Sequence, residues 1–143
     1  MKTGYFMRHG ETDLNRQGRM QGQSDYPLND TGRAQARQAG ARFAERGLRF
    51  DRVISSPLVR ARQTARRILG DSSLPVETDM RLSEQNFGIF EGLTYHEIES
   101  AYPGELGMWN ESFESYRIPD GESFADVRSR ADSFADDLWK MTA

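Results

Sequence analysis

The sequence predicts an α/β fold in which helices flank a mostly parallel sheet. Three short runs, at residues 3–7, 50–56 and 74–82, have the apolar, aromatic or β-branched character of extended segments. Longer runs with helical periodicity follow the first two, at residues 29–47 and 56–70. This alternation is typical of parallel sheets, whose strands are connected by helices. A chain of 143 residues suits a single domain.

The first predicted strand is the aromatic run TGYFM, which ends just before an Arg-His-Gly sequence. A polar loop follows it. Asn29 is a good N-cap for the next helix, which Gly47 would end. Gly40 shares the apolar face of this helix, so we expect a neighbouring element to approach closely there.

The second predicted strand, FDRVISS, leads directly into a helix. Ser56 can cap this helix, Pro57 suits its first turn and Gly70 ends it. The third extended segment is LPVETDMRL. Only nine residues of the chain are Val or Ile, so the sequence can supply few buried parallel strands.

The second half of the chain contains two further helix signals. Thr94 and Glu97 form a possible capping box for a short helix that runs to about Ala101. Residues 102–122 contain Gly and Pro at several points and are predicted to be irregular. Ser123 can cap the last helix. Its apolar stripe comprises Phe124, Val127, Ala131, Phe134, Leu138 and Met141.

Candidate functional residues lie where the predicted strands end. Arg8 and His9 follow the first strand, Arg60 follows the second just inside its helix, and Glu84 follows the third. Ligands of open α/β sheets bind at the carboxyl ends of the strands. We therefore expect these four side chains to gather at one edge of the sheet.

The combination of these residue types suits phosphoryl transfer. Guanidinium groups bind phosphate through paired hydrogen bonds. Nearby cations also lower the pKa of His9 and keep its imidazole neutral, and a neutral imidazole nitrogen can attack phosphorus. Glu84 could protonate the leaving oxygen. The spacing alone leaves alternatives open, because His9 could be a hydrogen-bonded strand-end histidine, Arg60 a solvated helix arginine and Glu84 an exposed loop carboxylate.

Four blocks occur in order along the chain: FMRHGETDLNRQGRMQGQSDYPLNDTGRAQA, VISSPLVRARQTA, LSEQNFGIFEGLTYHEI and PDGESFADVRSR. Together they resemble the histidine phosphatase superfamily, also called the phosphoglycerate mutase-like family. The resemblance extends from Met1 to the chain end and implies a three-layer α/β fold. It implies that His9 becomes phosphorylated, that Glu84 is the proton donor, that Arg8, Asn15 and Arg60 bind phosphate, and that Gln21 and Gly22 line the substrate site.

The sequence departs from the family pattern at its C-terminal end. The family carries a second histidine on a later strand, and this sequence has no residue that matches it. The other histidine, His96, lies in the short helix and is predicted to be a surface residue. We therefore expect residues 1–143 to form one C-terminally incomplete domain that lacks an inner strand between residues 3–7 and 50–56. Unpaired sheet edges would then favour self-association.

Composition narrows the classes of partner. The net charge of −3 favours neither nucleic acid nor an anionic membrane, and the chain has no cysteine. No segment reads as a signal peptide or a membrane span, so a cytoplasmic location is the expectation. Neither a metal nor another cofactor is implied.

The expected activity is phosphomonoester hydrolysis on a small phosphorylated metabolite. One alternative is a phosphate-binding or interaction module without turnover. The other is a cofactor-dependent phosphoglycerate mutase. The stretch from FGIFEG to PDGES argues against the mutase, because it holds a single arginine, Arg117, and no lysine, whereas those mutases carry basic substrate-binding segments there.

Overall fold

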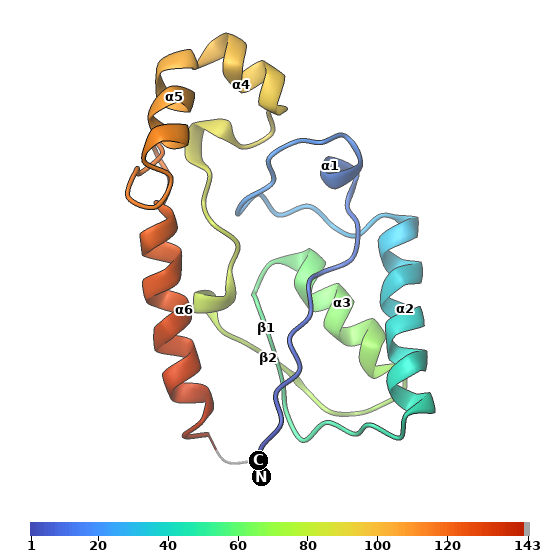
Figure 1. Cartoon of the computed structure of the whole chain (residues 1–143). Helices are drawn as coiled ribbons and strands as arrows, with labels where there is room; N and C mark the ends of the chain where they lie inside the picture. The colour runs from blue at the N-terminus through green and yellow to red at the C-terminus, as the bar shows by residue number, and fades with distance from the viewer. Residues whose placement is uncertain (142–143) are drawn as a thin grey trace.

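The computed structural model describes residues 1–141 and shows an α/β fold with a small parallel sheet (Figure 1). Strand β1 (Val53–Ser55) pairs in parallel with β2 (Val76–Thr78), with Ile54 opposite Glu77. Helix α3 (Val59–Leu69) connects the two strands. The predicted fold class is thereby confirmed, although the sheet that the described residues form has only these two strands.

The prediction of a strand at residues 3–7 is wrong. This segment makes no backbone hydrogen bond to any residue in the range 1–141. Its aromatic side chains are exposed, most of all Phe6 at 74%. A strand needs a neighbour to accept and donate its ladder hydrogen bonds, and β1 is paired on one side only, with β2. The apolar pattern of 3–7 therefore has no partner strand among the described residues.

Helices α2 (Asp30–Glu45) and α3 pack against each other. Asn29 caps α2 as predicted, because its side chain accepts a hydrogen bond from the Gly32 N–H. Close approach at Gly40 is also confirmed, since a Cβ atom there would lie 2.6 Å from the Ile68 carbonyl oxygen.

The start of α3 differs from the prediction. The helix begins at Val59, and the Ser56 hydroxyl accepts from the Leu58 N–H without capping the helix. The Val59 N–H donates instead to Asp25 Oδ1 at 2.7 Å. A carboxylate from a distant loop thus satisfies a donor that local sequence leaves open.

The second half of the chain supplies the main hydrophobic core. The capping box of Thr94 is confirmed and starts α4 (Tyr95–Ala101). Residues 102–122 are not wholly irregular, because α5 (Pro103–Glu111) lies within them and has proline at its first position, where proline is tolerated. The short 3-10 helices η1 (Met80–Leu82) and η2 (Gly88–Phe90) precede α4. The core comprises Phe90, Ile98, Leu106, Trp109 and Ile118.

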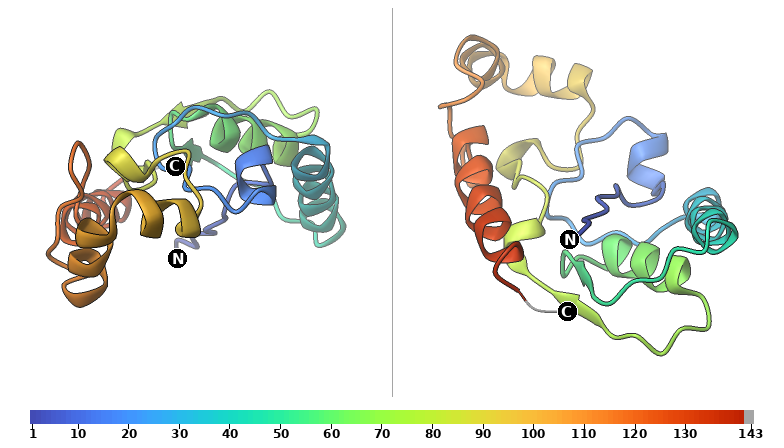
Figure 2. Two further views of the ribbon diagram at one scale, coloured as in Figure 1. Left: turned by 90° about the horizontal axis from the view of Figure 1, so that it is seen from above. Right: turned by 60° about the horizontal axis from the view of Figure 1, so that its bottom comes forward.

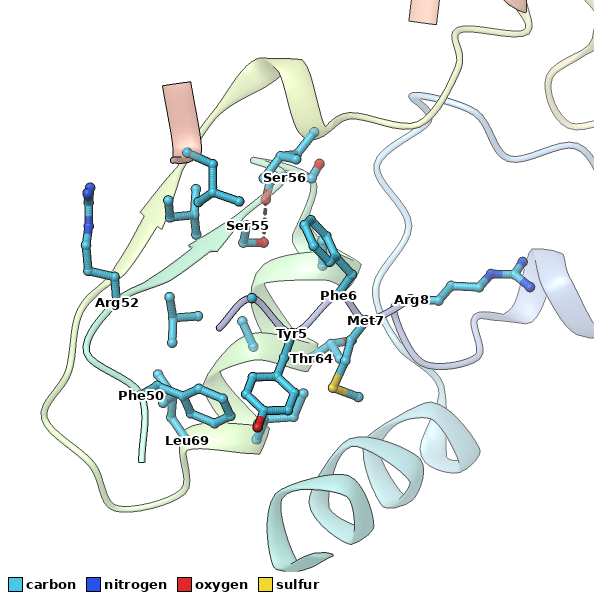
Figure 3. A pocket seen from close by; sticks show the side chains of 18 of the residues that line it. Tyr5, Phe6, Met7, Arg8, Phe50, Arg52, Ser55, Ser56, Thr64 and Leu69 are labelled. Carbon is cyan, nitrogen blue, oxygen red and sulfur yellow. Dashed lines mark hydrogen bonds between the residues drawn. The ribbon is translucent and has the colours of Figure 1, made fainter. Parts of the chain in front are cut away.

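Helix α6 (Phe124–Leu138) begins after Ser123 as predicted, but its apolar stripe is poorly covered. Of the residues in the helix, only Phe134 is buried. Figures 1 and 2 show α6 on one side of the molecule and α3 with α2 on the other. A hollow of about 840 Å³ lies between them, lined by the N-terminal segment, β1, α3 and α6 (Figure 3). Self-association through unpaired sheet edges stays a prediction.

Candidate active site

His9 lines this hollow and lies two residues after segment 3–7. It is half-buried, and its Nδ1 lies 2.7 Å from the Gly10 carbonyl oxygen. A carbonyl oxygen can only accept, so the proton of the neutral ring resides on Nδ1. Nε2 therefore carries the lone pair, and it accepts from Arg60 Nε at 3.3 Å. The nitrogen that faces the arginine is the nucleophilic one.

The surroundings of His9 lower its pKa below the ordinary value of 6.5. Burial is the largest cause, and the cations of Arg60 and Arg8 act in the same direction. The Gly10 carbonyl and the Glu84 carboxylate oppose them, without reversing the direction. The imidazole is therefore neutral at neutral pH, as the sequence predicts from its arginine neighbours.

We expect the ring of His9 to titrate below pH 6.5 in the folded protein. The unfolded chain takes up this proton as the pH falls through about 6.5, whereas the folded chain takes it up only at the lower pKa. The contribution of His9 to stability is therefore complete above pH 6.5 and is lost as the pH falls toward the folded-state pKa. NMR titration of the imidazole signals measures this, and His9→Ala identifies the His9 signal. A midpoint at or above 6.5 would contradict the expectation.

Arg60 projects from the first turn of α3 and is only 1% exposed, which rules out the solvated helix arginine that the sequence left open. Besides His9, its guanidinium donates to the carbonyl oxygens of Gly22 at 2.5 Å and Ser24 at 2.8 Å. Burial lowers its pKa, while the carboxylates of Glu84, Asp25 and Glu91 oppose that shift. Three of the five guanidinium N–H groups are used in these bonds, which leaves two for an oxyanion.

Glu84 and Arg8 line the same hollow as His9 and Arg60. Glu84 is exposed, and its Oε1 accepts from the Gln85 N–H at 2.8 Å. The electrostatic effect of its carboxylate raises the pKa of both His9 and Arg60. Figure 3 shows the Arg8 side chain extending away from the apolar side chains of the hollow. The four residues that were predicted to gather therefore line one hollow, with the Arg8 side chain directed away from its apolar part.

The three other predicted residues lie in the loop beside this hollow and do not line it. Asn15, in the short helix α1 (Asp13–Arg16), accepts from the Thr12 N–H through Oδ1, and its Nδ2 donates to no residue within 1–141. Gln21 is 6% exposed and accepts from the Thr12 hydroxyl at 2.6 Å. Gly22 has a positive φ of 55° and supplies a carbonyl to Arg60.

Sequence reasoning missed two side chains that hold the site together. Arg130 of α6 donates to the backbone carbonyls of Ser83 and Glu84 at 2.5 and 3.0 Å and forms an ion pair with Glu122. Glu91 accepts three hydrogen bonds from loops around Arg60. The partners of both residues are distant in sequence, so no local pattern indicates their role. The one signal that could have pointed to them is that both lie within the blocks that carry the family resemblance.

Within residues 1–141, no group of three His, Cys, Asp or Glu side chains could hold a metal ion. No helix in that part of the chain is long and apolar enough to cross a membrane.

Residues 5–142 match the sequence model of the histidine phosphatase superfamily (branch 1). The chain therefore belongs to this superfamily, as its motifs indicate. It is 37% identical over 143 residues to "Probable phosphoglycerate mutase GpmB" of Yersinia pestis (strain Pestoides F). That match covers 97% of this chain and 64% of the relative, so the chain spans about two thirds of the length of this relative.

Solved structures agree with the family assignment. The alpha-ribazole phosphatase from Shigella flexneri is similar with a TM-score of 0.88 and 30% identity, over 94% of this chain and 65% of that one. A mycobacterial glucosyl-3-phosphoglycerate phosphatase in complex with VO3 is similar with a TM-score of 0.80 and 36% identity, over 92% of this chain and 64% of that one. The fold that these proteins share is therefore present in the described part of the chain.

Proposed function

We propose that the protein hydrolyses phosphomonoesters through a phosphohistidine intermediate on His9. The observation that carries this proposal is the unprotonated Nε2 of His9 beside the buried guanidinium of Arg60. Nε2 attacks the phosphorus atom and forms a P–N bond as the P–O bond to the leaving group breaks. The leaving oxygen takes a proton from Glu84. Water then attacks the phosphorus atom of the phosphohistidine and gives a proton to the Glu84 carboxylate. The P–N bond to Nε2 breaks, which frees inorganic phosphate and restores His9 and protonated Glu84.

Arginine and amide groups around His9 would hold the phosphoryl oxygens. Arg60 has two unused N–H groups, Arg8 is a second cation near the imidazole, and Asn15 has an unused amide. Gln21 and Gly22 would shape the loop against which the rest of a small phosphorylated metabolite binds. Similarity to phosphatases, one of them solved with VO3, supports an oxyanion site here. The mechanism uses no metal or other cofactor.

Mapping of the covalent adduct tests the proposal. We expect incubation with a phosphate ester, followed by an alkaline quench, to yield phosphohistidine at residue 9. His9→Gln should abolish the adduct, whereas His96→Gln should retain it, because the His96 side chain is 88% exposed and is paired with Glu99 on α4. An adduct on His96, or on neither histidine, would overturn the proposal.

The second candidate is phosphate binding without turnover. The observation that favours it is that, in the described part of the chain, His9 is the single histidine at the hollow. Loss of one preorganised donor to developing charge reduces rate by about 10²–10³. Binding of vanadate without release of phosphate from a nitrophenyl ester would support this candidate over hydrolysis.

Mutase activity would require the phosphoryl group to return to substrate. Similarity to a protein named as a phosphoglycerate mutase makes this worth testing. The segment between η2 and α6 is poor in basic side chains, with Arg117 alone. We therefore expect 3-phosphoglycerate to yield phosphate and glycerate, and not its 2-phospho isomer.

A further inference from the structure

Residues 22–24 form a short strap across the buried guanidinium of Arg60. Two carbonyl groups of this strap, those of Gly22 and Ser24, accept from the two terminal nitrogens of Arg60. The third nitrogen of the same guanidinium, Nε, faces His9. The orientation of the two strap carbonyls therefore decides how Arg60 presents its charge to the nucleophile.

Glu91 binds the donors of the same strap. Its Oε1 accepts from the Gln23 N–H at 2.8 Å, and its Oε2 accepts from the Ser24 hydroxyl at 2.5 Å. Oε1 also accepts from the Phe87 N–H at 3.2 Å, which ties the carboxylate to the segment before η2. Glu91 thus accepts hydrogen bonds from N–H and O–H groups of the strap, while Arg60 donates hydrogen bonds to its carbonyl groups.

The strap is closely packed against Glu91. A Cβ atom at Gly22 would lie 2.1 Å from Glu91 Oε1, and the positive φ of this residue disfavours any side chain. A second contact joins the strap to the proton donor, because Gln23 Nε2 donates to the Glu84 carbonyl at 3.2 Å. Movement of the strap would therefore disturb Arg60 first and the backbone at Glu84 second.

We infer that Glu91 is a positioning residue, which orients the strap so that Arg60 is held against His9 and is ready to receive an oxyanion. This inference rests on the proposed function, in which Arg60 binds the phosphoryl group. The carboxylate has no direct hydrogen bond to Arg60 among the described residues. Its charge acts on Arg60 through space, and its hydrogen bonds act on Arg60 through the strap. A charged acceptor suits this task because hydrogen bonds to a carboxylate are stronger than those to a neutral group.

The first measurement is the affinity for vanadate, followed through the melting temperature of the whole 143-residue chain. We expect Glu91→Ala to weaken vanadate binding about tenfold to a hundredfold, the range that loss of a charged hydrogen-bond partner gives. Glu91→Gln should weaken it less, because the amide keeps one acceptor oxygen. Combining Glu91→Ala with Arg60→Ala should weaken binding no further than Arg60→Ala alone.

The second measurement is the NMR titration of His9, which requires neither turnover nor vanadate. Displacement of the Arg60 cation should move the pKa of His9 upward in Glu91→Ala and, to a smaller extent, in Glu91→Gln. Asp126→Ala is the matched control, because it removes a carboxylate that accepts from the Ser123 N–H and from Arg117, neither of which belongs to the strap. It should lower the melting temperature while the His9 titration stays unchanged.

The two readouts separate the possible failures. If wild-type protein binds no vanadate but the His9 titration still moves in Glu91→Gln, the proposed function fails and the positioning role stands. If Glu91→Gln folds, with an unchanged His9 titration and unchanged vanadate affinity, the positioning role is overturned. If Glu91→Ala does not fold, the two measurements on Glu91→Gln decide whether Glu91 is a positioning residue.

Discussion

Arg60→Ala is expected to abolish the rise in melting temperature that vanadate or inorganic phosphate gives to the wild-type protein. A ligand that binds only the folded state stabilises it by mass action, and Arg60 is the buried cation next to the nucleophile. We also expect formation of phosphohistidine to slow by about 10²–10³, the usual effect of removing one preorganised donor to developing charge. Differential scanning fluorimetry and rapid-quench adduct measurements test the two effects.

The comparison must be made on the ligand-induced shift and not on the melting temperature itself. Removal of the Arg60 guanidinium leaves the carbonyls of Gly22 and Ser24 without their donor, which destabilises the apo protein as well. Arg60→Lys keeps a charge but loses the planar fork, so it should also bind vanadate weakly. Arg62→Ala, an exposed arginine of the same helix, is the control. An equal shift in Arg60→Ala and wild type would remove Arg60 from the oxyanion site.

Glu84→Gln is expected to slow the hydrolysis of alkyl phosphates by about 10²–10⁴, the range for loss of a general acid. Nitrophenyl phosphate should be affected far less, because nitrophenolate leaves without needing a proton. Glu84 is exposed and lines the hollow, and its carboxylate raises the pKa of both His9 and Arg60. It is therefore close enough to the site to reach a leaving oxygen. The measurement is the turnover of both substrate types by Glu84→Gln, compared as the ratio of the rate loss on alkyl phosphates to the rate loss on nitrophenyl phosphate.

A matched variant separates proton donation from a structural effect. Glu99→Gln changes an exposed carboxylate on α4 that pairs with His96, so it should leave both rates unchanged. A uniform loss across alkyl and nitrophenyl esters in Glu84→Gln would assign Glu84 a structural role. A loss of rate confined to alkyl esters would identify Glu84 as the proton donor.

The sequence by itself determined the elements whose signals are local. Asn29, Thr94 and Ser123 each cap a helix through a backbone N–H three residues away, so a window of four residues contains the whole interaction. The position of His9 between Arg8 and the carbonyl of Gly10 is local in the same sense. The ordered motifs also sufficed to place the chain in its superfamily.

The tertiary structure decided features whose partners are distant in sequence. Segment 3–7 has the composition of a strand but no neighbouring backbone within residues 1–141, and a strand exists only where a ladder forms. The N-terminus of α3 is capped by Asp25, more than thirty residues earlier in the chain.

The same reason explains which parts of the site could be foreseen. His9, Arg60 and Glu84 were expected to gather because strand ends converge on one edge of a parallel sheet. All three line one hollow, although the segment before His9 forms no strand among the described residues. The burial of Arg60 beneath the strap, and the contacts of Glu91 on that strap, depend on loops that meet across 36 to 68 residues of chain. Periodicity and capping patterns contain no information at that separation, so only the folded chain reveals these contacts.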